Sequence, residues 1–587
     1  HTLQYVVIIK CIIYNVLVFK HCQRHLSASY NQCVAETCQV RLRTDAGRVC
    51  GRVRDAEDGT KYASFRGIPY AKPPLGDNRF KELQSPEPWD HLLDATEDGT
   101  ACPQKDFIYN RMTLHLKGMS EDCIHLNLHV PYDALPQSGK QQSSVVGVPI
   151  LVFVHGGAFQ VGSSLTDVHG PDYLLMKDVV AITFNFRIGV FGFLSLDTDQ
   201  IPGNQGLRDV ITLLRWVQRN ARAFGGNPND VTLVGHSTGG SMAHCVSLSE
   251  AADGLIHKVV LMSGNAISGA FSASPKHATY MANEFLRALG INSTDKEYIA
   301  QRLYKESLLN IIYAANVVQV TADLENYITF VPVVESKFPN VTRILDDDPH
   351  TLIAQGRGKQ YPLLNGFTDA EFHYFKWMVM ASNPMSRVAI KPKLLLPAHI
   401  AHYEPEDRQL QVANLIRQRY FNNTPTLDQM LDCLSDVFFI YPTMKLAEWR
   451  AMAGAHVYLY QFSYEAIKSV IKEAQWCDYR GVAHVEDLTY VWRVNAILNK
   501  SEKAIPPKNT DDLMRSWMSS IIVNFVRCGT PTCVRDDRRW PVLTMMHQYQ
   551  DIREPEIYKM SNFTKYQQDM VAFLDTNLKN CHNKSRK

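Results

Sequence analysis

The sequence has no marked excess of either charge, since 61 lysines and arginines stand against 59 aspartates and glutamates in 587 residues. This balance gives no reason to expect a nucleic acid or another polyanion as a partner. The sequence also contains neither a Cys-x-x-Cys pair nor a His-Glu-x-x-His sequence. We therefore assign no metal site.

Apolar runs long enough to cross a membrane are missing as well. Residues 5–19 are mostly apolar, but Lys10 interrupts them, and a bilayer needs ~20 such residues. No methionine precedes Met112, so we interpret residues 1–39 as an N-terminal extension that holds a defective or truncated signal region. The tail, residues 578–587, carries neither a retention signal nor a lipid-anchor signal. We expect no membrane anchor.

Cysteines are too few, at 13, for a scaffold built from disulfides, and their odd number leaves at least one free or paired outside the chain. Cys102 and Cys123 flank a short segment, and a disulfide between them would stabilise the fold by ~3 kcal/mol. Two buried free thiols are the alternative. Six Asn-x-Ser/Thr sequons favour a secreted, extracellular glycoprotein. They begin at Asn292, Asn340, Asn422, Asn499, Asn562 and Asn583.

What the sequence does contain is a series of apolar runs of strand length, as expected of strands covered on both faces. Between them, residues 206–224 place their apolar side chains on one helical face. Strands that alternate with helices predict an α/β protein with a largely parallel sheet. We expect one domain over residues 40–577. The runs occupy residues 149–154, 178–186, 258–262, 361–365 and 456–462.

Residues 231–240, VTLVGHSTGG, combine a strand with a G-x-S-x-G sequence and a helix start made of small residues. That order is typical of a nucleophile elbow, a strained turn that exposes a serine between a strand and a helix. A chain of this length contains the five-residue pattern by chance roughly a few tenths of the time. The preceding strand favours the functional interpretation, which makes Ser237 a candidate nucleophile.

A glycine pair follows the apolar strand of residues 149–154, in the sequence His155-Gly156-Gly157-Ala158-Phe159. Glycines at the carboxyl end of such a strand let backbone N–H groups point into a cleft, as an oxyanion hole requires. A tight turn without further function is the alternative. We favour the oxyanion hole because the pair lies where that loop must lie, before the serine.

A serine nucleophile needs a base, and the base needs a third group to orient it, in the chain order Ser, Asp or Glu, His. Asp369 and Glu371 both follow a short apolar strand, so the residues alone leave both open. His484 lies in a glycine-led segment, residues 481–488, that we expect to open a helix. Other histidines also follow the serine, namely His244, His373, His399, His402 and His456.

A set of motifs in a fixed order resembles the type-B carboxylesterase family, which includes insect and vertebrate carboxylesterases, juvenile-hormone esterases and cholinesterases. The resemblance covers essentially the whole folded chain. The matching stretches are FRGIPYAKPPLGDNRF, SEDCIHLNLHVP, HGGAF, FNFRIGVFGFLS, GNQGLRDVITLLRWVQRNARAFGGNPNDVTLVGHSTGG, GFTDAEF, GVAHVEDLTYVW and the pair Trp540-Pro541.

The resemblance implies an α/β-hydrolase fold with a large central, mostly parallel mixed sheet. It implies Ser237 as nucleophile, His484 as general base and acid, and Glu371 as the carboxylate that orients His484. It also implies a disulfide between Cys102 and Cys123 and an ion pair of Arg79 with Glu121. The family's second disulfide has no matching cysteine pair, so the pairing of the other cysteines stays open. The implied oxyanion hole consists of the N–H groups of Gly157, Ala158 and Thr238.

The chain departs from the family pattern beside the serine and in one loop. Many members have Glu and Ala on either side of the serine, where this chain has His236 and Thr238. Residues 103–122 contain no tryptophan, the residue that in cholinesterases stacks on the choline cation. The missing tryptophan argues against a cholinesterase, and the Gln usual before the serine of juvenile-hormone esterases is absent too.

We predict a serine carboxylesterase that hydrolyses small-molecule esters through an acyl-enzyme intermediate and needs no cofactor. An esterase resembling the juvenile-hormone esterases, or one that sequesters its esters, is an alternative within the same chemistry. A non-catalytic adhesion protein of the same fold is the alternative from another class. The sequence leaves the physiological ester and the oligomeric state open.

Overall fold

A computed structural model describes residues 38–105, 118–136, 147–269, 271–322, 328–381, 388, 391–421, 425–475, 478–496, 509–533, 540–544 and 547–578. Its centre is one 13-stranded sheet with the strand order β1-β2-β3-β5-β7-β6-β8-β9-β10-β11-β12-β13, and β4 pairs with β2 outside this path. The strands are β1 (Val40–Arg43), β2 (Arg48–Asp55), β3 (Lys61–Pro69), β4 (Leu92–Asp94), β5 (His125–Pro131), β6 (Val148–Val154), β7 (Val180–Phe184), β8 (Gly226–His236), β9 (Lys258–Met262), β10 (Leu363–Thr368), β11 (Val457–Phe462), β12 (Gln548–Ile552) and β13 (Met560–Asn562).

The sheet is parallel in its middle and antiparallel at both ends. From β7 through β6, β8, β9, β10 and β11 to β12 all neighbours run parallel. The pairs β1–β2, β2–β3, β3–β5, β5–β7 and β12–β13 run antiparallel. The predicted α/β fold with a mostly parallel mixed sheet is confirmed. Because carboxyl ends of parallel strands share one edge, groups that follow β6, β8, β10 and β11 meet there.

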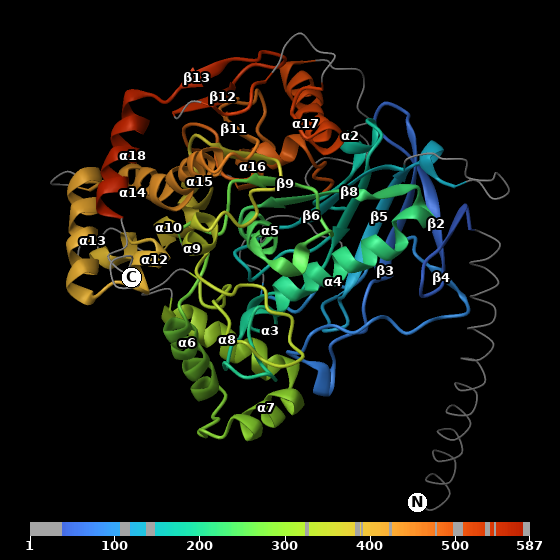
Figure 1. The fold of residues 1–587 in the computed structure, drawn as a ribbon, viewed down its shortest axis with the longest axis horizontal. Coiled ribbons are helices and arrows are strands. Elements are labelled where there is room, and N and C mark those ends of the chain that lie inside the picture. The colour runs from blue at the N-terminus through green and yellow to red at the C-terminus, as the bar shows by residue number, and fades with distance from the viewer. Residues whose placement is uncertain are drawn as a thin grey trace, which may run out of the picture.

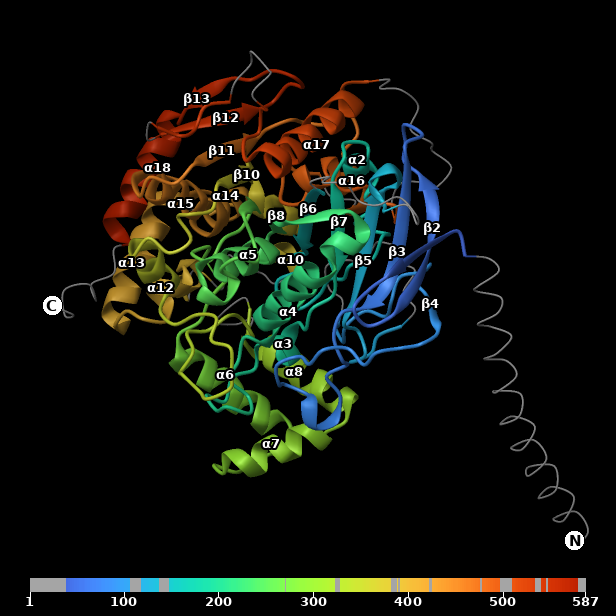
Figure 2. The same cartoon turned by 45° about the vertical axis from the view of Figure 1, so that its right-hand side comes forward.

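Helices cover both faces of the sheet (Figures 1 and 2). The longer ones are α4 (Gln205–Asn220), α5 (Thr238–Leu248), α6 (Pro275–Ala288), α7 (Lys296–Lys305), α8 (Leu308–Ala322), α13 (Glu406–Tyr420), α14 (Leu427–Ser435), α15 (Tyr441–Met452), α17 (Thr510–Cys528) and α18 (Lys565–Asn577). The shorter ones are α2 (Asp172–Leu175), α3 (Gly189–Phe193), α9 (Pro349–Ala354), α10 (Lys376–Ala381), α12 (Ala398–Ala401) and α16 (Val470–Gln475). In both views α6, α7 and α8 lie together at the lower end of the molecule.

The central strands separate two hydrophobic cores because successive side chains of a strand point to opposite faces. Along β6, Ile150 and Val152 join the core that contains the buried faces of α4 and α5. Leu151 and Phe153 join the other core, with α2 and α17. Burial on both faces explains why these strands are continuous apolar runs rather than alternating ones.

Several predicted boundaries shift in the structure. The strands at residues 149–154, 258–262 and 456–462 form nearly where they are expected. The strand that leads into the serine starts earlier, at Gly226, because it pairs with β6 from Val148 onward. The segment 481–488 does not open an α-helix. It is a loop followed by one short 3-10 turn, η8 (Asp487–Tyr490).

The described residues contain three disulfides, Cys38–Cys50, Cys102–Cys123 and Cys528–Cys533, and two buried free thiols, Cys245 and Cys433. Beside the second disulfide, the Arg79 guanidinium donates two hydrogen bonds of 2.6 Å to the Glu121 carboxylate. Within the described ranges no helix combines the length and the apolar character that a membrane span requires.

Candidate active site

Ser237 lies between the last residue of β8 and the first residue of α5, in a backbone conformation that is rare for an L-residue. Its φ is 57° and its ψ −129°. The turn leaves no room for a side chain at Gly235 or at Gly239, two residues before and two residues after the serine. A Cβ atom on Gly235 would lie 2.2 Å from the Gly239 oxygen, and one on Gly239 would lie 2.1 Å from the Val154 oxygen. The turn therefore has the backbone of a nucleophile elbow.

Glu371 and His484 meet at the same edge of the sheet, although 113 residues separate them. Glu371 begins the 3-10 turn η5 (Glu371–Phe375), three residues after β10 ends. Its Oε2 lies 2.6 Å from Nδ1 of His484, and its Oε1 accepts a hydrogen bond of 2.8 Å from the Thr368 N–H. The His484 N–H also donates to the Glu371 carbonyl oxygen at 3.1 Å. The Thr368 N–H thus fixes one oxygen of the Glu371 carboxylate, and the other oxygen holds the His484 ring.

The surroundings of His484 keep its imidazole neutral. Burial lowers the pKa of His484 to about 3 and raises the pKa of Glu371 to about 7. Since Glu371 occupies Nδ1, the atom left to take up a proton is Nε2. Among the described residues Nε2 has no hydrogen-bond partner, so it is not bonded to Ser237 here. Such contacts are often long in free enzymes and tighten when the substrate is bound.

The loop that follows β6 turns its backbone toward the serine. Three consecutive residues have a positive φ: Gly157 (125°), Ala158 (55°) and Phe159 (59°). A Cβ atom on Gly156 would lie 2.8 Å from the Ser237 Cβ, so the loop and the elbow are in close contact. The N–H groups of Gly157, Ala158 and Thr238 donate no hydrogen bond to any described residue. They are available to an oxyanion.

Buried aromatic side chains connect this loop with His484, and sequence reasoning did not identify most of them. The ring centroids form a chain: Phe193 to Phe159 at 5.1 Å, Phe159 to Phe271 at 5.8 Å, Phe271 to Phe439 at 5.9 Å, and Phe439 to His484 at 4.8 Å. Phe439 lies on a π-helical turn, η7 (Asp436–Ile440), between α14 and α15. Such turns are frequent at functional sites, but no feature of the sequence signals this one.

His236, the residue before the serine, packs against His484 at a centroid distance of 4.7 Å. Its Nε2 lies 4.0 Å from Oδ1 of Asp487, and neither atom has a hydrogen-bond partner among the described residues. Burial lowers the pKa of His236 well below its ordinary value and raises the pKa of Asp487 to about 7. The position beside the serine therefore carries an uncharged ring at neutral pH.

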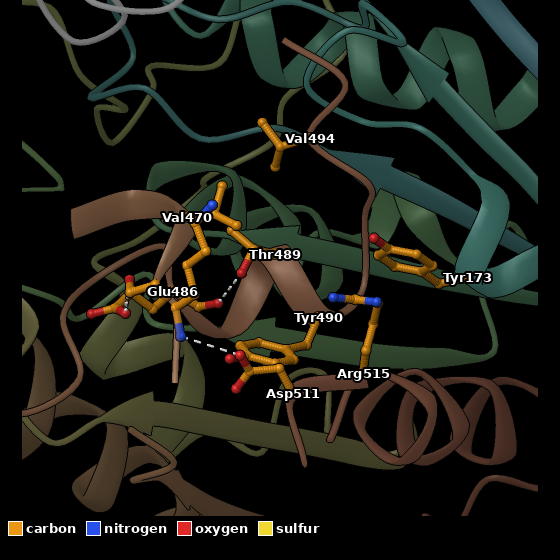
Figure 3. A pocket seen from close by; sticks show the side chains of 10 residues that line it. Tyr173, Val470, Glu486, Thr489, Tyr490, Val494, Asp511 and Arg515 are labelled. Carbon is orange, nitrogen blue, oxygen red and sulfur yellow. Dashed lines mark hydrogen bonds between the residues drawn. The ribbon is translucent and has the colours of Figure 1, made fainter. Parts of the chain in front are cut away.

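A small polar pocket lies next to the residues that follow His484 in the chain. Figure 3 shows Glu486, Thr489 and Asp511 among its lining side chains. None of the residues of the elbow, the glycine loop or the Glu371–His484 pair lines it. Glu486 accepts hydrogen bonds from the Ser469 hydroxyl, the Tyr479 hydroxyl and the Ala483 N–H. The pocket thus belongs to the structure that supports the His484 loop.

The other residues that the sequence offered lie elsewhere. Asp369, the alternative to Glu371, accepts the Val482 N–H at 2.7 Å and so holds the start of the His484 loop. His244, on α5, accepts the N–H of Ala266, which follows β9, and does not take part in the pair. Within the described ranges no group of three His, Cys, Asp or Glu side chains could hold a metal ion.

Three of the six sequons lie in the described part of the chain. Asn292, Asn340 and Asn562 are exposed. Asn422, Asn499 and Asn583 lie outside the described residues.

Comparison with known proteins gives one consistent result. A family model described as "Carboxylesterase family" matches residues 37–572. A juvenile hormone esterase of Heliothis virescens is 44% identical over 91% of this chain and 93% of its own length. Esterase FE4 of Myzus persicae is 29% identical over 90% of each chain.

Solved structures agree with the sequence comparison. The crystal structure of a juvenile hormone esterase from Manduca sexta, with OTFP covalently attached, is similar at a TM-score of 0.87 and 43% identity. The similarity covers 92% of this chain and 99% of that one. The predicted enzyme class is confirmed, and the non-catalytic alternative is not supported. With its elbow, its glycine loop and a match along almost its whole length, the chain belongs to the carboxylesterase family and is a carboxylic ester hydrolase.

Proposed function

We propose that Ser237 is the nucleophile, His484 the general base and acid, and Glu371 the carboxylate that orients His484. The observation that carries this proposal is the 2.6 Å contact between Glu371 Oε2 and His484 Nδ1 at the strand edge where the Ser237 turn lies. This contact fixes the tautomer in which Nε2 can accept a proton. The neutral ring of His484 is the form that a general base needs.

In the first half of the reaction the Ser237 Oγ attacks the carbonyl carbon of the ester while Nε2 of His484 takes its proton. The N–H groups of Gly157, Ala158 and Thr238 donate hydrogen bonds to the oxyanion that forms. The bond to the alcohol oxygen then breaks, and His484 gives its proton to the departing alcohol. The acyl group remains on Ser237 as an ester.

In the second half a water molecule attacks the acyl carbon while His484 takes one of its protons. The same N–H groups stabilise the second oxyanion. Its collapse breaks the bond to Ser237, which recovers its proton from His484, and the acid is released. All of these steps use groups of the chain and water, so no cofactor is required.

The test is Ser237→Ala, assayed with a small aryl ester. We expect kcat to fall by about 10⁴-fold or more, and labelling by an organophosphate probe to disappear. Ser241→Ala, one turn further along α5, is the matched control and should keep both. Turnover that survives in Ser237→Ala would refute the nucleophile assignment.

We further propose that juvenile hormone is a substrate. The support is the 44% identity to the Heliothis virescens enzyme and the 43% identity to the Manduca sexta enzyme, each over more than nine-tenths of this chain. The aromatic side chains from Phe193 to Phe439, which lie between the glycine loop and His484, make the surroundings of the site apolar, as an apolar ester requires. The measurement is kcat/KM for juvenile hormone against a series of aryl esters of increasing acyl length. Failure to hydrolyse juvenile hormone, with aryl esters still turned over, would reject this substrate and leave the esterase mechanism intact.

Location and domain extent belong to the same proposal. We propose that the protein is secreted, because its described part holds three disulfides and three exposed sequons. We also propose that residues 40–577 form one domain, since a single sheet runs from β1 to β13. A drop in apparent mass after enzymatic removal of N-glycans would support export.

A further inference from the structure

The side chain of Thr238 contacts the glycine loop, and this contact has no role in the mechanism proposed above. Its Oγ1 accepts a hydrogen bond of 3.3 Å from the N–H of Phe159. Thr238 is also the residue whose own N–H is one of the three proposed oxyanion donors. We propose that the Thr238 hydroxyl is a positioning group that fixes the loop carrying the other two donors, Gly157 and Ala158. This inference rests on the proposed role of Ser237.

The loop needs such a constraint because its backbone is strained. Ala158 and Phe159 both have φ values in the left-handed region, 55° and 59°, although neither is a glycine. Residues in this region persist only where the surrounding structure over-determines their conformation. Without external contacts the loop would relax and move its N–H groups away from the serine.

Residues from other parts of the chain supply these contacts. From α5, Thr238 accepts the Phe159 N–H. From the start of α3, the Gly189 N–H donates to the Phe159 carbonyl oxygen at 2.5 Å. The Gln160 side chain donates to Gln319 of α8 at 2.9 Å and to Thr329 at 3.1 Å. Both backbone groups of Phe159 are therefore held, and the Thr238 bond is the one that joins the loop to the serine's own helix.

Burial makes the hydroxyl difficult to replace. Phe159 is 2% exposed and Thr238 is 1% exposed, so solvent has little access to the Phe159 N–H. An alanine at position 238, which the sequence pattern of many family members has, offers this N–H no side-chain acceptor. A buried donor that loses its partner carries the full cost of its desolvation. Threonine is also stiff about χ1, so its Oγ1 stays in one place relative to its own N–H.

The consequence is that one residue sets the distance between the two parts of the oxyanion hole. The Thr238 N–H is the proposed donor at the start of α5, and the Thr238 hydroxyl holds the loop that carries the donors Gly157 and Ala158. Geometry of this kind stabilises charge that develops in the transition state and does little for the neutral ground state. The effect of the hydroxyl should therefore lie in kcat and not in KM.

The experiment compares Thr238→Val, which keeps the shape and loses the acceptor, with Thr238→Ser, which keeps the acceptor. Each is assayed for kcat and KM on an aryl ester and for inhibition by a trifluoromethyl ketone, which forms a tetrahedral adduct with serine esterases. We expect the valine variant to lose about 3- to 10-fold in kcat, the range that one hydrogen bond supports. Its KM should stay within about twofold, and the ketone should bind more weakly by the same factor as kcat falls. The serine variant should behave like the wild type.

Two results would overturn the proposal. One is a folded valine variant with unchanged kcat and unchanged ketone inhibition, and the other is a serine variant that loses as much as the valine variant. If Thr238→Val does not fold, Thr238→Ala removes the acceptor without adding a methyl group and is judged by the same two criteria. The Ser237→Ala test is separate, because retained activity there would reject the nucleophile assignment and not the hydrogen bond.

Discussion

The two sides of the proposed active site are built in different ways. On the serine side, the elbow and the glycine loop follow β8 and β6, two neighbouring strands, and place backbone N–H groups. On the base side, two side chains that are 113 residues apart, Glu371 and His484, meet through a 2.6 Å contact. On the first side, steric exclusion sets the backbone path and hydrogen bonds to Phe159 hold the loop in place. On the second side, hydrogen bonds and packing of side chains act without such backbone exclusion.

This difference explains why the serine side can be predicted from the sequence and the base side cannot. A backbone that passes within 2.2 Å of where a Cβ would lie requires glycine, so its geometry is visible as glycines at fixed spacing. A side-chain contact such as that of His484 depends on packing by distant residues, including Phe439 and His236. Nothing in the local sequence encodes such packing. The two sides should also respond differently to substitution.

The largest effect in this comparison is expected from Glu371→Gln on the base side. The amide keeps the size of the side chain but places an N–H₂ group where Nδ1 now finds an acceptor, so it favours the wrong tautomer of His484. We expect kcat to fall by about 10³- to 10⁴-fold with little change in KM. Asp369→Asn is the matched control, because this carboxylate contacts the Val482 N–H and not the ring. Equal losses in the two variants would show that the effect is structural.

A smaller but still large effect is expected from Gly157→Ala on the serine side. The new Cβ would lie 2.0 Å from the Val161 oxygen, in a residue with a φ of 125°. The loop must shift, and one or two oxyanion donors shift with it, so we expect kcat to fall by about 10²- to 10³-fold. Gly254→Ala is the control, since its φ is also positive, at 74°, but nothing lies within 4 Å of the new Cβ. A Gly157→Ala enzyme with normal kcat would mean that backbone sterics do not position the donors.

The smallest effect is expected from a substitution at His236, and it concerns the pH dependence of activity. His236 belongs to the elbow on the serine side, but its ring contacts His484 on the base side. In His236→Glu, the new carboxylate would lie beside Asp487 and face His484, and in its ionised form it would add a negative charge next to the imidazole ring. A negative charge stabilises the imidazolium form and raises the pKa of His484. The base must be neutral to accept a proton. As the pH is lowered, His484 of the variant would become protonated sooner, so activity would be lost at a higher pH than in the wild type.

The measurement for this variant is the pH profile of kcat/KM, whose acid limb should move up by about one pH unit. His236→Gln has a similar size and no charge, so its acid limb should stay in place. An acid limb that moves equally in both variants would attribute the shift to packing and not to charge.

Much of the fold follows from the sequence because a few physical rules determine it. The strands at residues 149–154 and 258–262 are buried on both faces, so their composition alone identifies them. The length of β8 and the end of β10 at Thr368 depend on pairing with neighbouring strands, which local composition does not record. The segment at residues 481–488 has the composition of a helix start. Its backbone N–H groups bond to side chains instead, Ala483 to Glu486 and Val482 to Asp369, and the segment begins as a loop.

The candidate site likewise has features that local sequence determines and features that only the folded chain determines. Ser237 stands out because its turn needs glycines, while His484 was one of several histidines until family resemblance selected it. The π-helical turn that carries Phe439 has no sequence signature, since one extra residue in a helix changes no composition. The disulfides Cys38–Cys50 and Cys528–Cys533 could not be paired either, because pairing depends on distances in the folded chain.

The backbone of Ser237 also has a consequence for thermal stability. A non-glycine residue in such a conformation costs the folded protein about 1–3 kcal/mol. Glycine would adopt φ 57°, ψ −129° with little strain. We therefore expect Ser237→Gly to melt at a higher temperature than the wild type, so that the proposed nucleophile lowers the stability of the fold that carries it.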